Sequence, residues 1–284
     1  MSILVKNTTV ITQNKNRELL KNTDVLVENN TISKIGNVSE KADHTIDGKN
    51  RILMPGLINA HTHTAASILR GFGDDMNLEE WLEKSIWPAE AKLTPKYTYW
   101  ASLLSMAEMI KTGTTCFNDM YFYADSIAKA TKEAGMRAIL GEVLFDFFKE
   151  ETKQQELNKA KKAIDSIIAM NDLRTRAAIS PHAIYSCAPE LLVAGKKIAV
   201  KNNTIFHIHV SETKKEVDDC VKKHKLRPIE YLENLGVLGE NVVFAHACYL
   251  SKNEIDIVKK HEAKIAHCPT SNMKLATGGV IDWP

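Results

Sequence analysis

From Gly56 onward, short apolar segments alternate with longer amphipathic stretches, and this alternation restricts the fold more than any other feature. Seven segments are candidate strands: Gly56–Ala60, Thr114–Asn118, Arg137–Val143, Arg176–Ser180, Thr204–Val210, Val242–Ala245 and Lys264–His267. Candidate helices between them include Thr98–Thr112, Asp125–Ala134, Glu156–Asn171, Pro189–Lys201 and Lys252–His261. Strands that alternate with helices favour a parallel sheet with helices outside it. The pattern predicts an α/β fold, a (β/α)8 TIM-type barrel with seven visible βα units and the eighth absent.

The first 54 residues have a different pattern. Short β-branched segments are separated by turn-forming pairs such as Asn29-Asn30 and Asp47-Gly48. Such a pattern is typical of strands joined by tight turns. We therefore expect a small, antiparallel, β-sandwich-like domain over residues 1–54 and a barrel over residues 55–284. The barrel is expected to be truncated after strand seven, because seven strands are counted where such a barrel has eight.

Charge and apolar patterning exclude two classes of partner. The 284 residues carry 37 Lys+Arg against 35 Asp+Glu, a formal charge of +2, so the balance indicates no nucleic-acid surface. No apolar run approaches the roughly 18 residues that a membrane span needs. Five scattered cysteines without CxxC spacing favour a reducing compartment. We expect a cytoplasmic protein whose partner is a small molecule, and assembly into a homo-oligomer is left open.

Two histidine pairs end candidate strands. His61 and His63 follow the apolar segment Leu57-Ile58, and residues i and i+2 of an extended chain face the same way. His207 and His209 share a face at the end of the fifth strand, with Glu212 three residues further on. The carboxyl ends of barrel strands form the active face of such a fold. His61, His63 and His209 are therefore candidate metal ligands, whereas His207 is expected to be a packed core residue.

Single histidines recur at neighbouring strand ends. His182, His246 and His267 each follow or end a candidate strand. A lone histidine is usually structural, but its recurrence in successive βα units favours a functional role for His182 and His246, and His267 is left open. A divalent ion held by imidazoles with an open position lowers the pKa of a water ligand to about 7. A carboxylate such as Glu212 can then move protons, which favours a hydrolytic enzyme.

Several motifs together resemble one known family. They are Met54-Pro-Gly-Leu-Ile-Asn-Ala-His-Thr-His, Trp87-Pro-Ala-Glu, Gly113-Thr-Thr-Cys-Phe-Asn-Asp-Met-Tyr, Ser180-Pro-His-Ala, His207-Ile-His-Val-Ser-Glu-Thr and Cys268-Pro-Thr-Ser-Asn. These segments resemble the amidohydrolase superfamily. Within it, they are similar to the 5-methylthioadenosine/S-adenosylhomocysteine deaminases, which include the 5′-deoxyadenosine deaminases. The resemblance extends from residue 1 to about residue 277.

The resemblance implies a role for each matching residue. It implies that residues 55–284 form a metal-dependent hydrolase barrel with one divalent metal ion, zinc first and iron as the alternative. The ion is implied to be held by His61, His63 and His209 with an aspartate at the end of strand eight. Asp282 follows strand seven too soon to be that aspartate. Glu212 is implied as the catalytic proton shuttle that also contacts the purine, and His246 as the catalytic residue that orients water. His182 and Glu90 are implied as substrate-binding residues, with Glu90 on the ribose hydroxyls.

The resemblance also implies the reaction. The expected activity is hydrolytic deamination of the adenine ring of 5′-deoxyadenosine, 5-methylthioadenosine, S-adenosylhomocysteine or adenosine, which yields inosine-type products and ammonia. Some relatives place arginines after strand three to meet the 5′ substituent, but here the segment is Leu144-Phe-Asp-Phe-Phe-Lys-Glu. A small apolar 5′ group is thus as consistent as a carboxylated one. The alternatives are another amidohydrolase, of the guanine deaminase, cytosine deaminase or triazine hydrolase type, or a catalytically inactive truncated paralogue.

Overall fold

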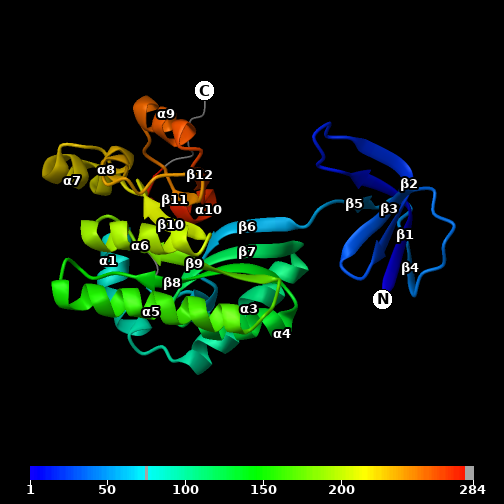
Figure 1. The fold of residues 1–284 in the computed structure, drawn as a ribbon, viewed down its shortest axis with the longest axis horizontal. Coiled ribbons are helices and arrows are strands. Elements are labelled where there is room, and N and C mark those ends of the chain that lie inside the picture. Colours follow the sequence, from blue (N-terminus) through cyan, green and yellow to red (C-terminus); the bar gives the residue numbers. More distant parts are fainter. Residues whose placement is uncertain (74–75, 279–284) are drawn as a thin grey trace. The chain divides into compact units, whose positions relative to one another are not determined.

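The structure, a computed structural model, describes residues 1–73 and 76–278. These residues divide into two compact units, Met1–Leu57 and the chain from Ile58 onward. Each unit has its own sheet, and Figure 1 shows the elements of both. Within the described part of the chain, no helix is both long and apolar enough to cross a membrane.

The first unit is a single five-stranded sheet. Its strands are β1 (Ser2–Ile11), β2 (Leu19–Glu28), β3 (Thr31–Gly36), β4 (His44–Asp47) and β5 (Ile52–Leu53). The hairpins β1–β2 and β2–β3 are antiparallel, but β4 and β5 both pair parallel with β1. The expectation of a wholly antiparallel unit is therefore wrong. Residues 37–43 are long enough to carry the chain back across the sheet, so β4 can run beside β1 in the same direction.

The second unit is built on a parallel seven-stranded sheet. Its strands are β6 (Leu57–Thr62), β7 (Thr114–Tyr121), β8 (Arg137–Leu144), β9 (Thr175–Pro181), β10 (Ile205–Val210), β11 (Val242–His246) and β12 (Lys264–Ala266). They lie side by side in chain order, with β6 and β12 at the two edges. All seven predicted strands are confirmed, with ends that differ by a few residues. The first strand runs two residues further than expected, so His61 lies within it.

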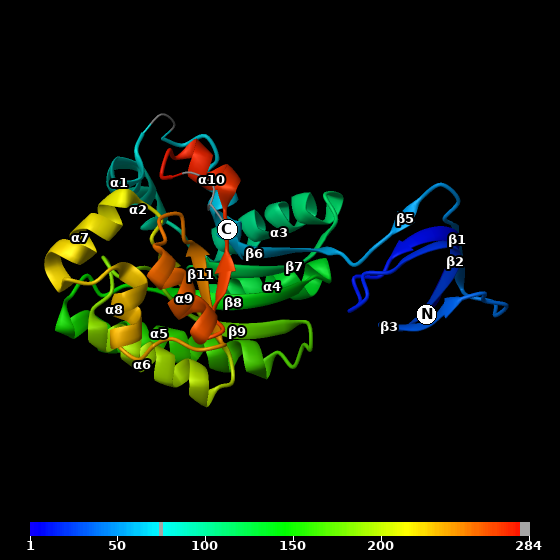
Figure 2. The same cartoon turned by 90° about the horizontal axis from the view of Figure 1, so that it is seen from above.

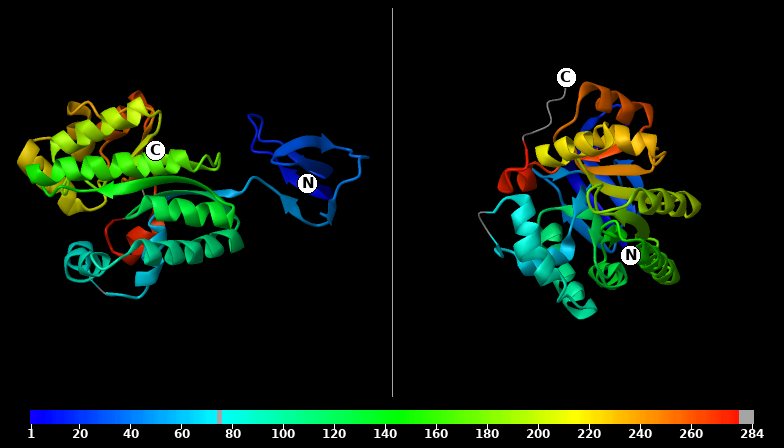
Figure 3. Two further views of the ribbon diagram at one scale, coloured as in Figure 1. Left: turned by 60° about the horizontal axis from the view of Figure 1, so that its bottom comes forward. Right: turned by 90° about the vertical axis from the view of Figure 1, so that its left-hand side faces the viewer.

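Helices cover the outer face of this sheet. They include α3 (Pro95–Lys111), α4 (Ala124–Ala134), α5 (Glu150–Ala169) and α6 (Pro189–Lys201). Fully buried side chains such as Phe117, Phe206 and Phe244 come from the strands and form one continuous core with these helices. The inner strands β8 to β11 are largely buried on both faces and are mostly apolar, whereas the edge strand β6 is largely exposed. Figure 3 (right) looks along the strands and shows the helices outside them.

Shorter elements gather at the carboxyl ends of the strands (Figure 2). After β6 come the 3-10 helix η1 (Thr64–Leu69), the short helix α1 (Leu78–Trp81), the π-helix η2 (Leu82–Ile86) and the short helix α2 (Trp87–Glu90). After β10, β11 and β12 come the helices α7 (Lys214–His224), α8 (Pro228–Asn234), α9 (Lys252–Lys260) and α10 (Pro269–Lys274). π-helical turns are frequent at functional sites. The strand ends and these short elements are where the predicted site residues lie.

Candidate metal centre and substrate cavities

His63 and His209 present free nitrogen lone pairs to each other. The Nδ1–H of His63 donates to the carbonyl of Met120 at 2.6 Å, and the Nδ1–H of His209 donates to the carbonyl of His182 at 2.8 Å. Each neutral ring therefore keeps its lone pair on Nε2, and the two Nε2 atoms lie 3.3 Å apart. Two facing lone pairs repel unless a cation lies between them. Two nitrogen ligands of a tetrahedral zinc ion are about 3.3 Å apart, so this pair fits a divalent metal.

His61 and His246 complete the cluster. One nitrogen from each of His61, His209 and His246 lies within 4.8 Å of the other two, a grouping that could hold a metal ion. The ring of His61 also lies edge-on to that of His63, with centroids 4.8 Å apart. The structure therefore brings together all three ligands expected from the sequence, and it adds His246 at the same point. Asp282 lies outside the described residues.

A second layer of polar groups supports His61. Its Nδ1 is 3.0 Å from Nε2 of His207, which is completely buried. The other ring nitrogen of His207, Nδ1, lies 3.2 Å from the amide nitrogen of Asn118. The same amide nitrogen donates to the carbonyl of Ala60 at 3.0 Å. His207 and Asn118 thus support the position of the His61 ring.

Burial keeps these imidazoles neutral, which is the form that binds metals. Burial, followed by the neighbouring histidines, lowers the pKa of His61 and His209 well below the usual value. The same causes lower the pKa of His182 and His207 to about 3. For His246, burial lowers the pKa to about 4. A cation shared by uncharged imidazoles is compatible with this environment, whereas added protons are not.

Glu212 is held at the cluster by a second carboxylate. The backbone N–H groups of Ser211 and Glu212 both donate to the Glu216 carboxylate at 2.9 Å. Ser211 has a left-handed backbone, so the chain turns sharply after β10 before α7 begins. Burial, followed by the charge of Glu216, raises the pKa of Glu212 to about 8. One Glu212 oxygen lies 3.6 Å from Nδ1 of His246.

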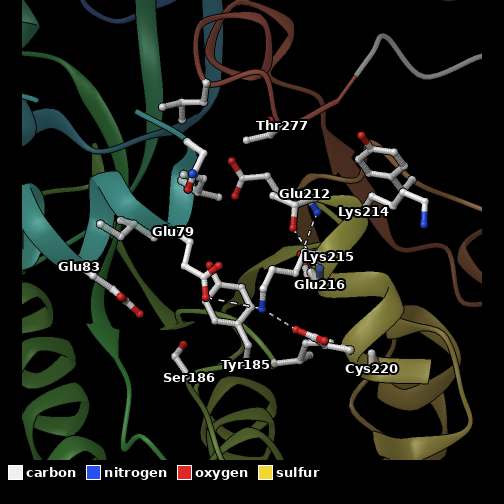
Figure 4. A pocket seen from close by; sticks show the side chains of 18 of the residues that line it. Glu79, Glu83, Tyr185, Ser186, Glu212, Lys214, Lys215, Glu216, Cys220 and Thr277 are labelled. Atoms are coloured by element: carbon white, nitrogen blue, oxygen red, sulfur yellow. Dashed lines mark hydrogen bonds and ion pairs between the residues drawn. The ribbon is translucent and has the colours of Figure 1, made fainter. Parts of the chain in front are cut away.

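Two cavities adjoin this cluster. The larger, of about 780 Å³, is lined by Glu212, Tyr185 and apolar residues including Phe147 and Phe148. Figure 4 shows Glu212 and Glu216 in this cavity, with Glu79 and Glu83 on a neighbouring wall. The smaller cavity, of about 320 Å³, is lined by His63, His182 and Glu90. Leu82 and Trp87 line both cavities.

Glu90 is a half-buried carboxylate at the end of α2. Burial raises its pKa to about 7, and a hydrogen bond with Tyr121 acts against that rise. His182 lies in the same cavity, where its Nδ1 is 2.8 Å from the Ser186 hydroxyl. Both predicted substrate-binding residues thus face a cavity that reaches the histidine cluster through His63. His267 is set apart, because its Nδ1–H donates to the carbonyl of His246.

Sequence reasoning missed several supporting polar residues. Asp119 is buried and accepts a hydrogen bond from the backbone N–H of Thr64, the residue after His63. Glu216 accepts a hydrogen bond from the backbone N–H of Glu212. Asn118 contacts His207 through its amide nitrogen, and Asn272 contacts His246 in the same way. The pair Asn118-Asp119 ends a candidate strand in the same way as the histidines, and this signal could have been used. Nothing local distinguishes Glu216 from a solvated helix residue.

Comparison with known proteins agrees with this arrangement. The model of the amidohydrolase family matches residues 52–279. The chain belongs to the amidohydrolase family. It is 46% identical over 279 residues to the 5′-deoxyadenosine deaminase of Methanosphaera stadtmanae, covering 98% of this chain and 64% of that protein. The 5′-deoxyadenosine deaminase of Methanococcus vannielii is 47% identical over 264 residues, covering 91% and 63% respectively.

A solved structure shows the same fold. The crystal structure of an adenosine deaminase from Xanthomonas campestris with bound zinc matches with a TM-score of 0.91 and 31% identity. The match covers 98% of this chain and 64% of that one. This amidohydrolase chain thus spans slightly less than two thirds of the length of the relatives it matches.

The carboxylate of Glu216 is predicted to stabilise the turn that carries Glu212. In the Glu216→Ala variant two buried N–H groups lose their acceptor, which is expected to lower the free energy of unfolding by about 2–4 kcal/mol. Glu216→Gln keeps one acceptor oxygen and should lose less. Urea denaturation of the metal-free protein measures both changes. The exposed Asp219→Ala on the same helix is the control, with an expected change of about 0.5 kcal/mol or less. An equal loss in the Ala variant and this control would contradict the assignment.

Proposed function

We propose that this amidohydrolase deaminates the adenine ring of 5′-modified adenosines by hydrolysis, with 5′-deoxyadenosine as the preferred substrate. The observation that carries the proposal is the pair of facing Nε2 lone pairs of His63 and His209, with Glu212 in the adjoining cavity. The printed names of the relatives, 5′-deoxyadenosine deaminase and adenosine deaminase, support the choice of substrate class.

His61, His63 and His209 are proposed to hold one divalent metal ion, zinc first and iron as the alternative. Imidazole nitrogens suit both ions. When bound with an open position, such an ion acidifies a water ligand so that a nucleophilic hydroxide forms near neutral pH. The backbone carbonyls of Met120 and His182 orient two of the rings for this task.

Glu212 is proposed to move the protons. It takes a proton from the attacking water as the water oxygen bonds to C6, and it gives this proton to the adjacent ring nitrogen of adenine. It then takes the second proton from the new C6 hydroxyl and gives it to the amino group, which leaves C6 as ammonia. The water oxygen becomes the carbonyl oxygen of the inosine-type product. A pKa raised by burial suits a group that must both accept and donate near neutral pH. His246, close to Glu212, is proposed to orient the attacking water.

The cavities support binding of the nucleoside. We propose that Glu90 accepts hydrogen bonds from the ribose hydroxyls and that His182 contacts the substrate in the smaller cavity. In the larger cavity, Phe147 lies edge-on to Trp87 with ring centroids 5.7 Å apart, which gives an apolar wall. Glu79 and Glu83 line the same cavity together with three lysines, and Lys215 pairs with Glu79 at 3.5 Å. A small apolar 5′ group fits these surroundings better than a carboxylated one.

A substrate panel tests the proposal. Ammonia release is measured from 5′-deoxyadenosine, 5-methylthioadenosine, S-adenosylhomocysteine and adenosine, with guanine and cytosine as alternatives. Chloride release is measured from a chlorinated triazine. We expect the highest kcat/KM for 5′-deoxyadenosine and the lowest among the nucleosides for S-adenosylhomocysteine, because its charged amino-acid end must leave water for the apolar wall of Trp87 and Phe147. Turnover of guanine, cytosine or the triazine alone would reject the substrate class. A metal-loaded protein that turns over none of these compounds would indicate an inactive paralogue.

The metal assignment has its own test. Elemental analysis of the purified protein is expected to find about one metal ion per chain. Changing His61, His63 and His209 together to alanine should abolish binding, because the facing lone pairs disappear. His44→Ala, in the separate N-terminal sheet, should keep the metal. Full metal content in the triple variant would contradict the assignment.

The role of Glu212 is tested by removing only its charge and proton. Glu212→Gln is expected to keep the metal and to lower turnover by roughly 10²–10⁴-fold, the usual contribution of general acid–base catalysis. The exposed Glu240→Gln serves as the matched control and should retain turnover. Near-normal turnover in Glu212→Gln would reject the proton-transfer role, and loss of the metal would instead make Glu212 a ligand.

A further inference from the structure

The hydrogen-bond partner on one nitrogen of a neutral imidazole decides which nitrogen keeps the hydrogen. In His63 and His209 that partner is a backbone carbonyl at Nδ1, so the hydrogen is on Nδ1. His246 has a different partner. The side-chain amide nitrogen of Asn272 lies 3.1 Å from its Nδ1. An amide nitrogen only donates, so Nδ1 of His246 must accept and the hydrogen is on Nε2.

The Asn272 amide is held in this orientation. Asn272 is completely buried on α10, and its Nδ2 also donates to the Thr277 hydroxyl at 2.8 Å. Both amide hydrogens are therefore used, one on His246 and one on Thr277. Two other polar atoms face Nδ1 of His246, the Oδ1 of the same amide at 3.5 Å and a Glu212 oxygen at 3.6 Å. Both separations exceed the usual hydrogen-bond range, so the amide nitrogen at 3.1 Å is the effective partner.

The contact with Asn272 distinguishes His246 from the neighbouring histidines that are proposed to bind the metal. His246 lies in the same group as His61 and His209, and distance alone would allow all three to bind one ion. A ligand must direct a lone pair at the metal, however. The lone pair of His246 is on Nδ1 and faces the Asn272 amide, whereas its Nε2 carries a hydrogen. His246 is therefore equipped to donate a hydrogen bond.

We propose that Asn272 is a positioning residue that holds His246 in the Nε2–H tautomer, so that His246 donates a hydrogen bond into the site and does not bind the metal. The tautomer rests on the amide nitrogen of Asn272 lying nearer to Nδ1 of His246 than the amide oxygen does. Its consequence for turnover rests on the proposed deaminase function.

Nitrogen NMR on the full protein tests the tautomer without any assay of activity. Long-range ¹H–¹⁵N spectra of ¹⁵N-histidine protein are recorded without metal and with added zinc, and His246→Gln identifies the His246 signals. We expect a protonated Nε2 and a lone-pair-bearing Nδ1 on His246 in both states, while the Nε2 signals of His63 and His209 move with zinc. A hydrogen on Nδ1 of His246, or loss of the Nε2 hydrogen when zinc binds, would overturn the proposal.

Asn272→Asp tests the consequence, because a carboxylate accepts a hydrogen bond where the amide donates one. The variant should move the His246 hydrogen to Nδ1, keep its zinc, and lower kcat by about 10–100-fold with little change in KM. The exposed Asn158→Asp on α5 is the matched control and should leave kcat unchanged. A reversed tautomer with normal kcat would refute the positioning role. If the wild-type protein turns over no nucleoside, the proposed function fails, but the wild-type NMR spectrum still decides the tautomer of His246. The same spectrum decides the tautomer if the Asn272→Asp variant does not fold.

Discussion

Two imidazole nitrogens that face each other with their lone pairs are the constraint on which the site depends. The Nδ1–H of His63 and that of His209 each donate a hydrogen bond to a backbone carbonyl, one within β7 and the other directly after β9. The rings therefore cannot turn away or exchange tautomers without losing a hydrogen bond. Burial prevents relief by protonation, because it lowers the pKa of both rings. A divalent cation between the two nitrogens satisfies every one of these conditions.

The parallel sheet makes this geometry available. Strands that run in the same direction place their carboxyl ends at one edge, so residues far apart in the chain meet there. His61 and His207 are 146 residues apart in sequence, yet their ring nitrogens are 3.0 Å apart. The core of buried phenylalanine, leucine and isoleucine side chains keeps the strands in register. The polar residues at the ends of these strands are then available for metal binding and catalysis.

Carboxylates and amides around the cluster act through other residues. Glu216 holds the turn that carries Glu212, and Asp119 holds the backbone that follows His63. Asn272 fixes one ring nitrogen of His246. Such partners orient the groups that touch metal or substrate, and they contribute to activity without contacting either. The difference between His246 and its neighbouring histidines lies in its partner, since all of them are neutral imidazoles at strand ends.

The sequence by itself determined the seven strands, the helices between them and the residues that end the strands, because these depend on local periodicity and on residues i and i+2 sharing a face. It also determined the family, since whole motifs carry it. It did not determine that β4 and β5 pair parallel with β1, because the path of a connection depends on distant packing. Only the tertiary structure decided which nitrogen of each histidine is free. That choice is made by Met120, His182 and Asn272, which are remote in the chain from the rings that they contact.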